Sequence, residues 1–125
     1  MTFDYDIFLD DICLPPRPEP GEAIRPLVVC RTAKAFRDTI TALGYPKFIH
    51  FDNDLGEAEE GRHLAKWLLE RIAEDVEEGG VAPEIDWYVH SMNPIGTQAI
   101  NDLMFSIRQY REQRNSQNDD GREAQ

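Results

Sequence analysis

The chain has 125 residues, 41% of them hydrophobic, and a formal net charge of −11. This length suits one domain with a hydrophobic core and leaves little room for a second. The negative charge argues against binding of duplex nucleic acid, because its phosphate backbone would be repelled. No apolar run approaches the ~20 residues of a membrane span. With no secretory leader before Phe3 and two cysteines, Cys13 and Cys30, that we expect to be reduced, the composition predicts a cytoplasmic protein.

The first predicted strand covers residues 3–9 and runs directly into Asp10 and Asp11. The next segment, residues 12–26, contains five of the eight prolines, which excludes a regular helix. We expect it to be a loop that covers or shapes the mouth of a site. A second short apolar strand follows at residues 27–30, and it ends at Arg31.

A helix is predicted over residues 33–43. Thr32 can accept a hydrogen bond from an unpaired amide at its start, and Gly44 can end it. The chain then enters a short apolar strand, residues 48–51. Directly after this strand it becomes acidic at Asp52 and Asp54, and it breaks at Gly56. Carboxylates at the end of a strand indicate a site, because ligands of open parallel sheets bind outside the carboxyl ends of the strands.

The second half of the chain repeats the alternation of helix and strand. A helix is predicted between Gly56 and about Gly79, with acidic residues at its start and apolar residues at helical spacing. Residues 85–89 (IDWYV) form the fourth predicted strand. We interpret the aromatic side chains of Trp87 and Tyr88 in this strand as core or half-core residues before ligand platforms.

The last helix begins with a strong signal. Asn93 can cap the free amides, and Pro94 favours the first helical position. Apolar residues continue at helical spacing as far as Tyr110, and we expect the helix to fade after Arg111. Residues 112–125 contain Ala124 as their only apolar residue. We therefore predict one domain, residues 1–111, followed by a disordered polar tail, residues 112–125.

Strands that alternate with helices predict an α/β fold with a mainly parallel sheet and right-handed crossovers. We expect a small three-layer sandwich with four strands in the order 2-1-3-4. In this order the first and third strands are neighbours at the centre of the sheet, and the topological switch point lies between them. The carboxyl ends of all four strands then meet at one edge.

Four acidic residues are predicted to gather at this edge. They are Asp10, Asp11, Asp52 and Asp54. Carboxylates a few ångströms apart raise each other's pKa, and a hard divalent cation bound by oxygen ligands relieves the repulsion. We therefore predict a site for Mg²⁺ or Mn²⁺. The alternative, that two or three of these acids cap loops or helices and face water, remains open.

His90 and Ser91 lie just before the start of the last predicted helix, whose free amides favour anions. With Arg31 and Asn93 they are candidates to bind a phosphate opposite the metal, and His90 can exchange a proton near neutral pH. The alternative for His90 is a buried histidine bonded to a neighbouring loop. For Ser91 and Asn93 it is helix capping, which we favour for Asn93. His50, inside the central strand, is assigned no functional role.

Five motifs occur in order along the chain: LDD at residues 9–11, VCR at 29–31, FDNDLG at 51–56, GRHLAKWL at 61–68 and HSMNPIG at 90–96. With these motifs the chain resembles the cyclic-phosphate processing receiver-like domain family over nearly all of residues 6–107. The resemblance implies a flavodoxin- or receiver-like fold and metal-dependent handling of cyclic phosphate ends or nucleotides. It also implies an acidic, metal-facing set and a group of residues that complete the pocket: Asp10, Asp11, Asp52 and Asp54, then Arg31, His90, Ser91 and Asn93.

The sequence also departs from the family. The family commonly has DHDLG where this chain has Asn53, so any role of that histidine is lost. Ordinary receivers need a lysine at the carboxyl end of a strand, and the lysines of this chain lie elsewhere, which disfavours phosphorelay signalling. A phosphoacceptor role for Asp52 remains a third option.

We therefore predict a divalent-metal-dependent phosphoesterase that acts on cyclic phosphate ends or nucleotides. Asp52, His90 and Arg31 are its predicted catalytic residues, and Arg31 also binds phosphate together with Ser91 and Asn93. The expected partner is a phosphate-containing small molecule or a nucleic-acid end. The alternative is a non-catalytic, receiver-like module that binds a nucleotide or acts as an adaptor for a protein.

Overall fold

The structure, a computed structural model, describes residues 4–12, 15 and 25–123, with side chains as far as residue 114. Most of the proline-rich segment, and Cys13 within it, lie outside the described residues, as does the loop predicted there. The elements are β1 (Asp6–Leu9), β2 (Leu27–Cys30), α1 (Ala33–Leu43), β3 (Phe48–Phe51), α2 (Gly61–Glu77), β4 (Asp86–Val89) and α3 (Pro94–Glu123).

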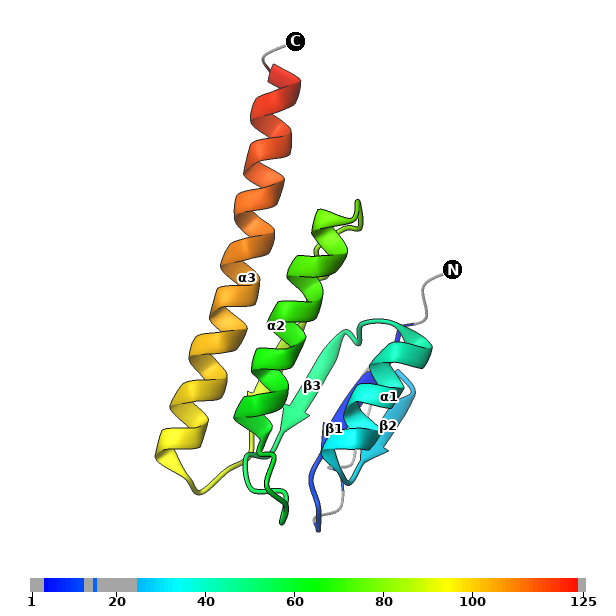
Figure 1. Cartoon of the computed structure of the whole chain (residues 1–125), viewed down its shortest axis with the longest axis vertical. Coiled ribbons are helices and arrows are strands. Elements are labelled where there is room, and N and C mark those ends of the chain that lie inside the picture. The colour runs from blue at the N-terminus through cyan, green and yellow to red at the C-terminus, as the bar shows by residue number, and fades with distance from the viewer. Residues whose placement is uncertain (1–3, 13–14, 16–24, 124–125) are drawn as a thin grey trace.

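The four strands form one sheet in the order β2-β1-β3-β4, and all three neighbouring pairs are parallel (Figure 1). The predicted order and direction of the strands are therefore confirmed. β1 lies between β2 and β3, and Ile7 is paired with Val28 on one side and with Ile49 on the other. Because parallel strands point the same way, the residues that follow β1 and β3 emerge side by side at one edge of the sheet.

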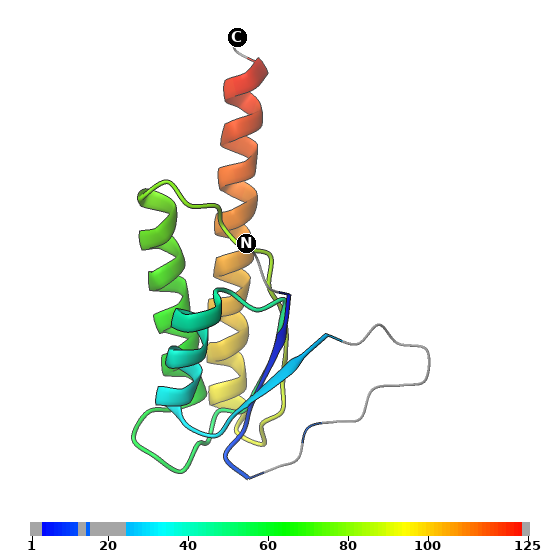
Figure 2. The same cartoon turned by 90° about the vertical axis from the view of Figure 1, so that its right-hand side faces the viewer.

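The three described helices lie on the same face of the sheet (Figure 2). α1 joins β2 to β3 and α2 joins β3 to β4, so both crossovers step across the sheet in the same direction. Right-handed crossovers that step in one direction place their helices on one face. The connection from β1 to β2 steps the other way, but its five prolines oppose a helix. In the described part of the chain the helices therefore form one layer, packed on one face of the sheet (Figure 2).

The hydrophobic core lies between the sheet and the helices. Along each strand, side chains alternate between two faces, so Ile7 and Leu9 of β1 point into the core, as do Ile49 and Phe51 of β3. The helices contribute further fully buried side chains: Phe36, Ile40, Leu64, Leu68, Ile72, Ile100 and Met104. The same alternation places Phe8, Phe48, His50 and Tyr88 on the opposite face of the sheet, which we call the open face.

The ends of α1 follow the sequence signals. The Thr32 hydroxyl accepts a hydrogen bond from the Ala35 amide at 3.1 Å, and the helix ends at Gly44, as predicted. α2 begins at Gly61, later than expected, because Glu57 and Glu59 contact α1 and only Glu60, the N-cap residue, lies at the start of α2. The Glu57 carboxylate accepts a hydrogen bond from the Ala33 amide at 2.7 Å and so caps α1 instead of starting α2.

α3 begins at Pro94 as predicted, but it continues to Glu123 and does not end near Arg111. Residues 112–114 are Glu, Gln and Arg, which favour helix, and each added residue extends a helix that is already formed. The helix therefore runs through most of the segment predicted to be a disordered tail, residues 112–125. None of the helices in the described chain has an apolar stretch long enough to cross a lipid bilayer.

The packing of α3 predicts two very different effects of the same substitution. Ile100 is completely buried against the core, whereas Ile95, in the first turn of the same helix, is 72% exposed. Ile100→Ala should lower the free energy of unfolding by about 2–5 kcal/mol, because it leaves a cavity. Ile95→Ala should change it by less than about 0.5 kcal/mol. Urea unfolding of both variants measures the difference, and similar losses would contradict this packing.

Candidate metal centre

The carboxyl ends of the four strands place functional side chains in one row across the sheet. Backbone hydrogen bonds extend the sheet by one residue, from the amides of Asp10, Asp52 and His90 to carbonyl oxygens of the neighbouring strands, with N to O distances of 3.1, 3.0 and 2.7 Å. The register of the strands therefore continues into this row. We call it the acid row, and its members in sheet order are Arg31, Asp10, Asp52 and His90.

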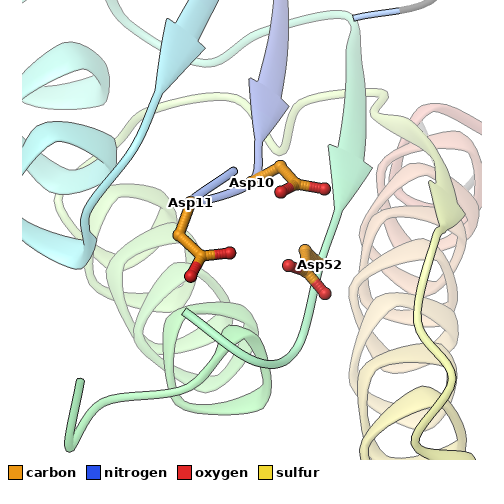
Figure 3. Close-up of side chains that lie close together, drawn as sticks. All are labelled: Asp10, Asp11 and Asp52. Atoms are coloured by element: carbon orange, nitrogen blue, oxygen red, sulfur yellow. The ribbon is translucent and has the colours of Figure 1, made fainter. Parts of the chain in front are cut away.

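Three carboxylates meet at the centre of this edge. Asp10, Asp11 and Asp52 each contribute one oxygen atom, and these atoms lie within 4.8 Å of one another. Figure 3 shows the three side chains around a common space, Asp10 and Asp11 after β1 and Asp52 after β3. Asp10 is only 5% exposed. Because carboxylate oxygens are the preferred ligands of Mg²⁺, Mn²⁺ and Ca²⁺, this group can hold a divalent cation.

The crowding of the carboxylates changes the acidity of Asp52. Burial, together with the negative charges of Asp10, Asp11 and Asp54, raises the pKa of Asp52 to about 6 against the opposing hydrogen bond from the Asp54 amide. The ionised form is therefore unfavourable in the metal-free protein. A bound cation would reverse this preference, because positive charge stabilises the carboxylate.

Asp54, the fourth predicted ligand, does not belong to the group of three. Its side chain is exposed, and its backbone amide donates a hydrogen bond to Asp52 Oδ1 at 3.4 Å. This contact holds the Asp52 carboxylate from the side of the following turn. The contact seen for Asp54 therefore orients the Asp52 carboxylate, and the role of Asp54 as a metal ligand stays a prediction.

The residues predicted to bind phosphate surround the acids but make structural contacts. Arg31 Nη1 donates to the backbone carbonyl of Asp10 at 3.1 Å. Asn93 Oδ1 accepts hydrogen bonds from the amides of Ile95 and Gly96, both at 3.1 Å, and so caps α3. Ser91 Oγ accepts a hydrogen bond from the Asn93 amide at 3.1 Å. For Ser91 and Asn93 the observed contacts are those of the capping alternative, and phosphate binding stays a prediction.

His90 is exposed and lies beside Asp52 in the acid row. Its Nε2 atom is 3.1 Å from Nδ1 of His50, and the two rings are stacked with centroids 5.4 Å apart. The alternative of a buried His90 bonded to a loop is therefore not what the structure contains. Burial lowers the pKa of both histidines; the Asp10 charge opposes this for His90, while His90 adds to it for His50. Both rings are thus neutral at neutral pH.

Sequence reasoning missed His50 and Asn53. His50 stands two residues before Asp52, and this spacing is the signal that both side chains project on the same side of the sheet. Asn53 is fully buried. Its Nδ2 donates to Glu60 Oε2 at 2.6 Å and its Oδ1 accepts from the Arg62 amide at 3.2 Å. Asn53 therefore ties the end of β3 to the start of α2.

Two glycines allow the helices to approach this buried amide. A Cβ atom on Gly96 would lie 2.3 Å from Cγ of Asn53, and a Cβ on Gly61 would lie 2.1 Å from the carbonyl oxygen of Asp52. Both distances are far shorter than any real contact, so neither helix could sit where it does with a larger residue. The glycines at the ends of the GRHLAKWL and HSMNPIG motifs are the sequence signal for this close packing.

Gly56 allows the turn after β3 to pass close to Asp11. Its φ of 70° lies in the left-handed region that favours glycine, and a Cβ atom there would lie 3.1 Å from Oδ2 of Asp11. The turn that contains it is attached to α1 through an ion pair between Arg37 and Glu59, with N to O distances of 2.5 and 3.0 Å. The turn after β3 is therefore fixed close to Asp11.

The sequence profile of the cyclic-phosphate processing receiver domain matches residues 5–106 of the chain. No curated protein sequence matches it. Among solved structures, the chain is similar to one described as a yeast Spc42 trimeric coiled coil in a fusion, at 13% identity and a TM-score of 0.49, over 94% of this chain and 86% of the other. A similarity at this level supports no conclusion about function.

Asp52→Asn should stabilise the metal-free protein. The pKa of Asp52 rises from 3.8 to about 6 on folding, so metal-free stability falls as pH rises between these values, and the asparagine variant lacks this loss. Near neutral pH we expect a gain of about 1 kcal/mol, limited by solvent screening at this half-exposed group. Mn²⁺ should raise the melting temperature of the native protein and not that of the variant.

Thermal unfolding in chelator and in Mn²⁺ measures both effects. Asp38→Asn, at an exposed position of α1, is the matched control and should respond to Mn²⁺ like the native protein. A metal-free Asp52→Asn protein that is less stable than the native one, or one that Mn²⁺ still stabilises, would contradict the proposed metal centre.

Gly96→Ala should lower the free energy of unfolding by about 2 kcal/mol, because its methyl group would clash with Asn53. Asn53→Ala should lower it by about 1–3 kcal/mol, because buried partners lose their hydrogen bonds. The double variant should lose at least about 1 kcal/mol less than the sum, because the smaller side chain makes room for the methyl group. Urea unfolding measures this cycle, with Ser106→Ala of α3 as a near-neutral control. Additive losses would refute the steric explanation.

Proposed function

Because the chain belongs to the cyclic-phosphate processing receiver domain family, we propose that it is a divalent-metal-dependent phosphoesterase acting on cyclic phosphate ends or nucleotides. The observation that carries the proposal is the group formed by Asp10, Asp11 and Asp52 at the carboxyl edge of the sheet. Family membership supports a phosphate substrate, and the acidic group supports a cation that neutralises it. Neither alone would bring a phosphate to a chain with a net charge of −11.

The chemistry of the acidic group fits Mg²⁺ or Mn²⁺. The ligands that the described residues offer are all carboxylate oxygens, which suit hard cations. The raised pKa of Asp52 supports the same conclusion, because the ionised group needs positive charge nearby. A cation held there would polarise the phosphoryl oxygens and lower the pKa of a coordinated water.

His90 is the group that we propose moves the proton. It follows Asp52 in the acid row, and its Nε2 is 3.1 Å from Nδ1 of His50, so we assign the proton transfer to its other ring nitrogen, Nδ1. A neutral imidazole can accept a proton from attacking water, and the resulting imidazolium can donate it to the leaving oxygen. The lowered pKa of His90 supports the role of a base at neutral pH. His50 fixes the orientation of the ring and is a positioning residue.

Positive charge at the two ends of the row completes the proposal. Arg31 brings a permanent charge beside Asp10 and would stabilise the negative charge on a phosphate in the transition state. On the other side, Ser91 and Asn93 define the N-terminus of α3, whose dipole favours an anion. Their contribution to phosphate binding is then to hold the helix start in place.

The positions of the lysines favour hydrolysis over phosphorelay signalling. Lys34 pairs with Asp38 on the exposed side of α1, and Lys66 approaches Glu70 on α2. Lys47 precedes β3, at the opposite end of that strand from Asp52. No lysine of the chain therefore stands beside the three acids to sense a phosphorylated aspartate.

The direct test is incubation of the protein with 2′,3′-cyclic AMP and Mn²⁺ or Mg²⁺, with chromatography of the products. We expect a nucleoside monophosphate, and a loss of rate of at least about 100-fold in both Asp52→Asn and His90→Ala. Asp38→Asn is the control and should keep full activity. Binding of the nucleotide without product would favour the non-catalytic module, and absence of both Mn²⁺ binding and turnover would refute the enzyme.

A further inference from the structure

The open face carries a continuous set of rings directly beside the acid row. His50 and Tyr88 stand two residues before Asp52 and His90 along their strands, and His50 is paired with Tyr88 across the sheet. The ring of His90 lies 4.6 Å from that of Tyr88 and 5.4 Å from that of His50, between centroids. Phe48 extends the set, with its ring 4.7 Å from that of His50.

Two of these rings, Tyr88 and His90, are exposed. Tyr88 is 59% exposed and was interpreted from sequence as a core or half-core residue. His90 is also exposed. The reason is the one-sided arrangement of the helices, which leaves no helix of the described chain over this face (Figure 2). An exposed aromatic surface beside a polar site is typical of a site that binds a planar ligand.

The distance between the acid row and the rings of His50 and Tyr88 suits a ligand that carries both a charged and a planar group. Residues two apart on a strand are about 7 Å apart, so the exposed rings lie one step from the carboxylates. A nucleotide has its phosphate and its base on one sugar and can reach both rows. Stacking on the rings does not depend on attraction between the phosphate and a chain with a net charge of −11.

We propose that Tyr88, His90 and His50 form a stacking platform for the base of the nucleotide whose phosphate lies at the acids. The inference rests on the proposed function and narrows its preferred substrates to nucleotides and single-stranded nucleic-acid ends, which should bind more tightly than phosphate esters without a base. A base inside a duplex is already stacked on its neighbours and cannot lie on this face. Because every base has a flat surface, the platform discriminates little between bases.

The test uses Tyr88→Ala and Tyr88→Phe, with Phe105→Ala as the control, because this half-exposed ring of α3 packs against Trp87 and is not part of the proposed platform. The probes are 2′,3′-cyclic AMP and glycerol 1,2-cyclic phosphate, which has no base, both with Mn²⁺. Tyr88→Ala should raise the Kd and KM for cyclic AMP about 10-fold, with kcat nearly unchanged, and should leave the values for the glycerol ester unchanged. Tyr88→Phe keeps the ring and should behave like the native protein.

Equal losses with the two probes, or no loss with either, would overturn the platform. A Tyr88→Phe protein as impaired as Tyr88→Ala would do the same. Turnover of both probes without an effect of Tyr88→Ala leaves the phosphoesterase standing and removes the platform. Binding of 2′,3′-cyclic AMP that depends on Tyr88, without Mn²⁺ binding or turnover, would support the platform and remove the phosphoesterase. A short single-stranded RNA with a 2′,3′-cyclic end distinguishes the two possible ligands, a free nucleotide and an RNA end. Tighter binding of this RNA than of 2′,3′-cyclic AMP would identify RNA ends as the ligand.

Discussion

The repulsion between carboxylates on adjacent parallel strands is the constraint on which the site depends. Asp10 and Asp52 cannot move apart, because the pairing of β1 with β3 fixes their backbones and the buried pair Ile7 and Ile49 anchors both strands in the core. The repulsion is therefore a property of the fold and persists as long as the sheet does. A protein that keeps such a contact gives up stability in its metal-free state and gains affinity for a cation in return.

The turn after β3 holds the repelling carboxylates in a defined geometry. Asn53 is buried under the first turns of α2 and α3, where glycines admit it, so the turn is held from the side of the helices as well as from β3. Rigid support of this kind keeps reactive groups in place when charges repel. The acids lie at the ends of β1 and β3, and His90 lies at the end of the neighbouring strand β4. The first turns of α2 and α3 complete the arrangement. The precision of the site thus comes from elements that belong to the core.

Much of this could be predicted from the sequence, because the informative signals are local. Short apolar strands, the caps at Thr32 and Asn93 and the stop at Gly44 define the elements, and their alternation gives the order of the sheet. The carboxylates could be placed because strand ends converge in any parallel sheet. Three features could not be obtained in this way. The partner of His90 depends on the register between β3 and β4, the burial of Asn53 depends on helices far along the chain, and the face of the sheet that each described helix covers depends on the direction of its crossover.

The central position of β1 also has a consequence for how the chain folds. Its pairing with β3 joins segments some forty residues apart in the sequence, and parallel pairing over such separations is slow. Until then the edge of β1 that pairs with β3 is open to pairing with another molecule. Asp10 and Asp11, directly after the strand, bring like charges that would disfavour such association. The same carboxylates that strain the finished domain would therefore protect it while it is still incomplete.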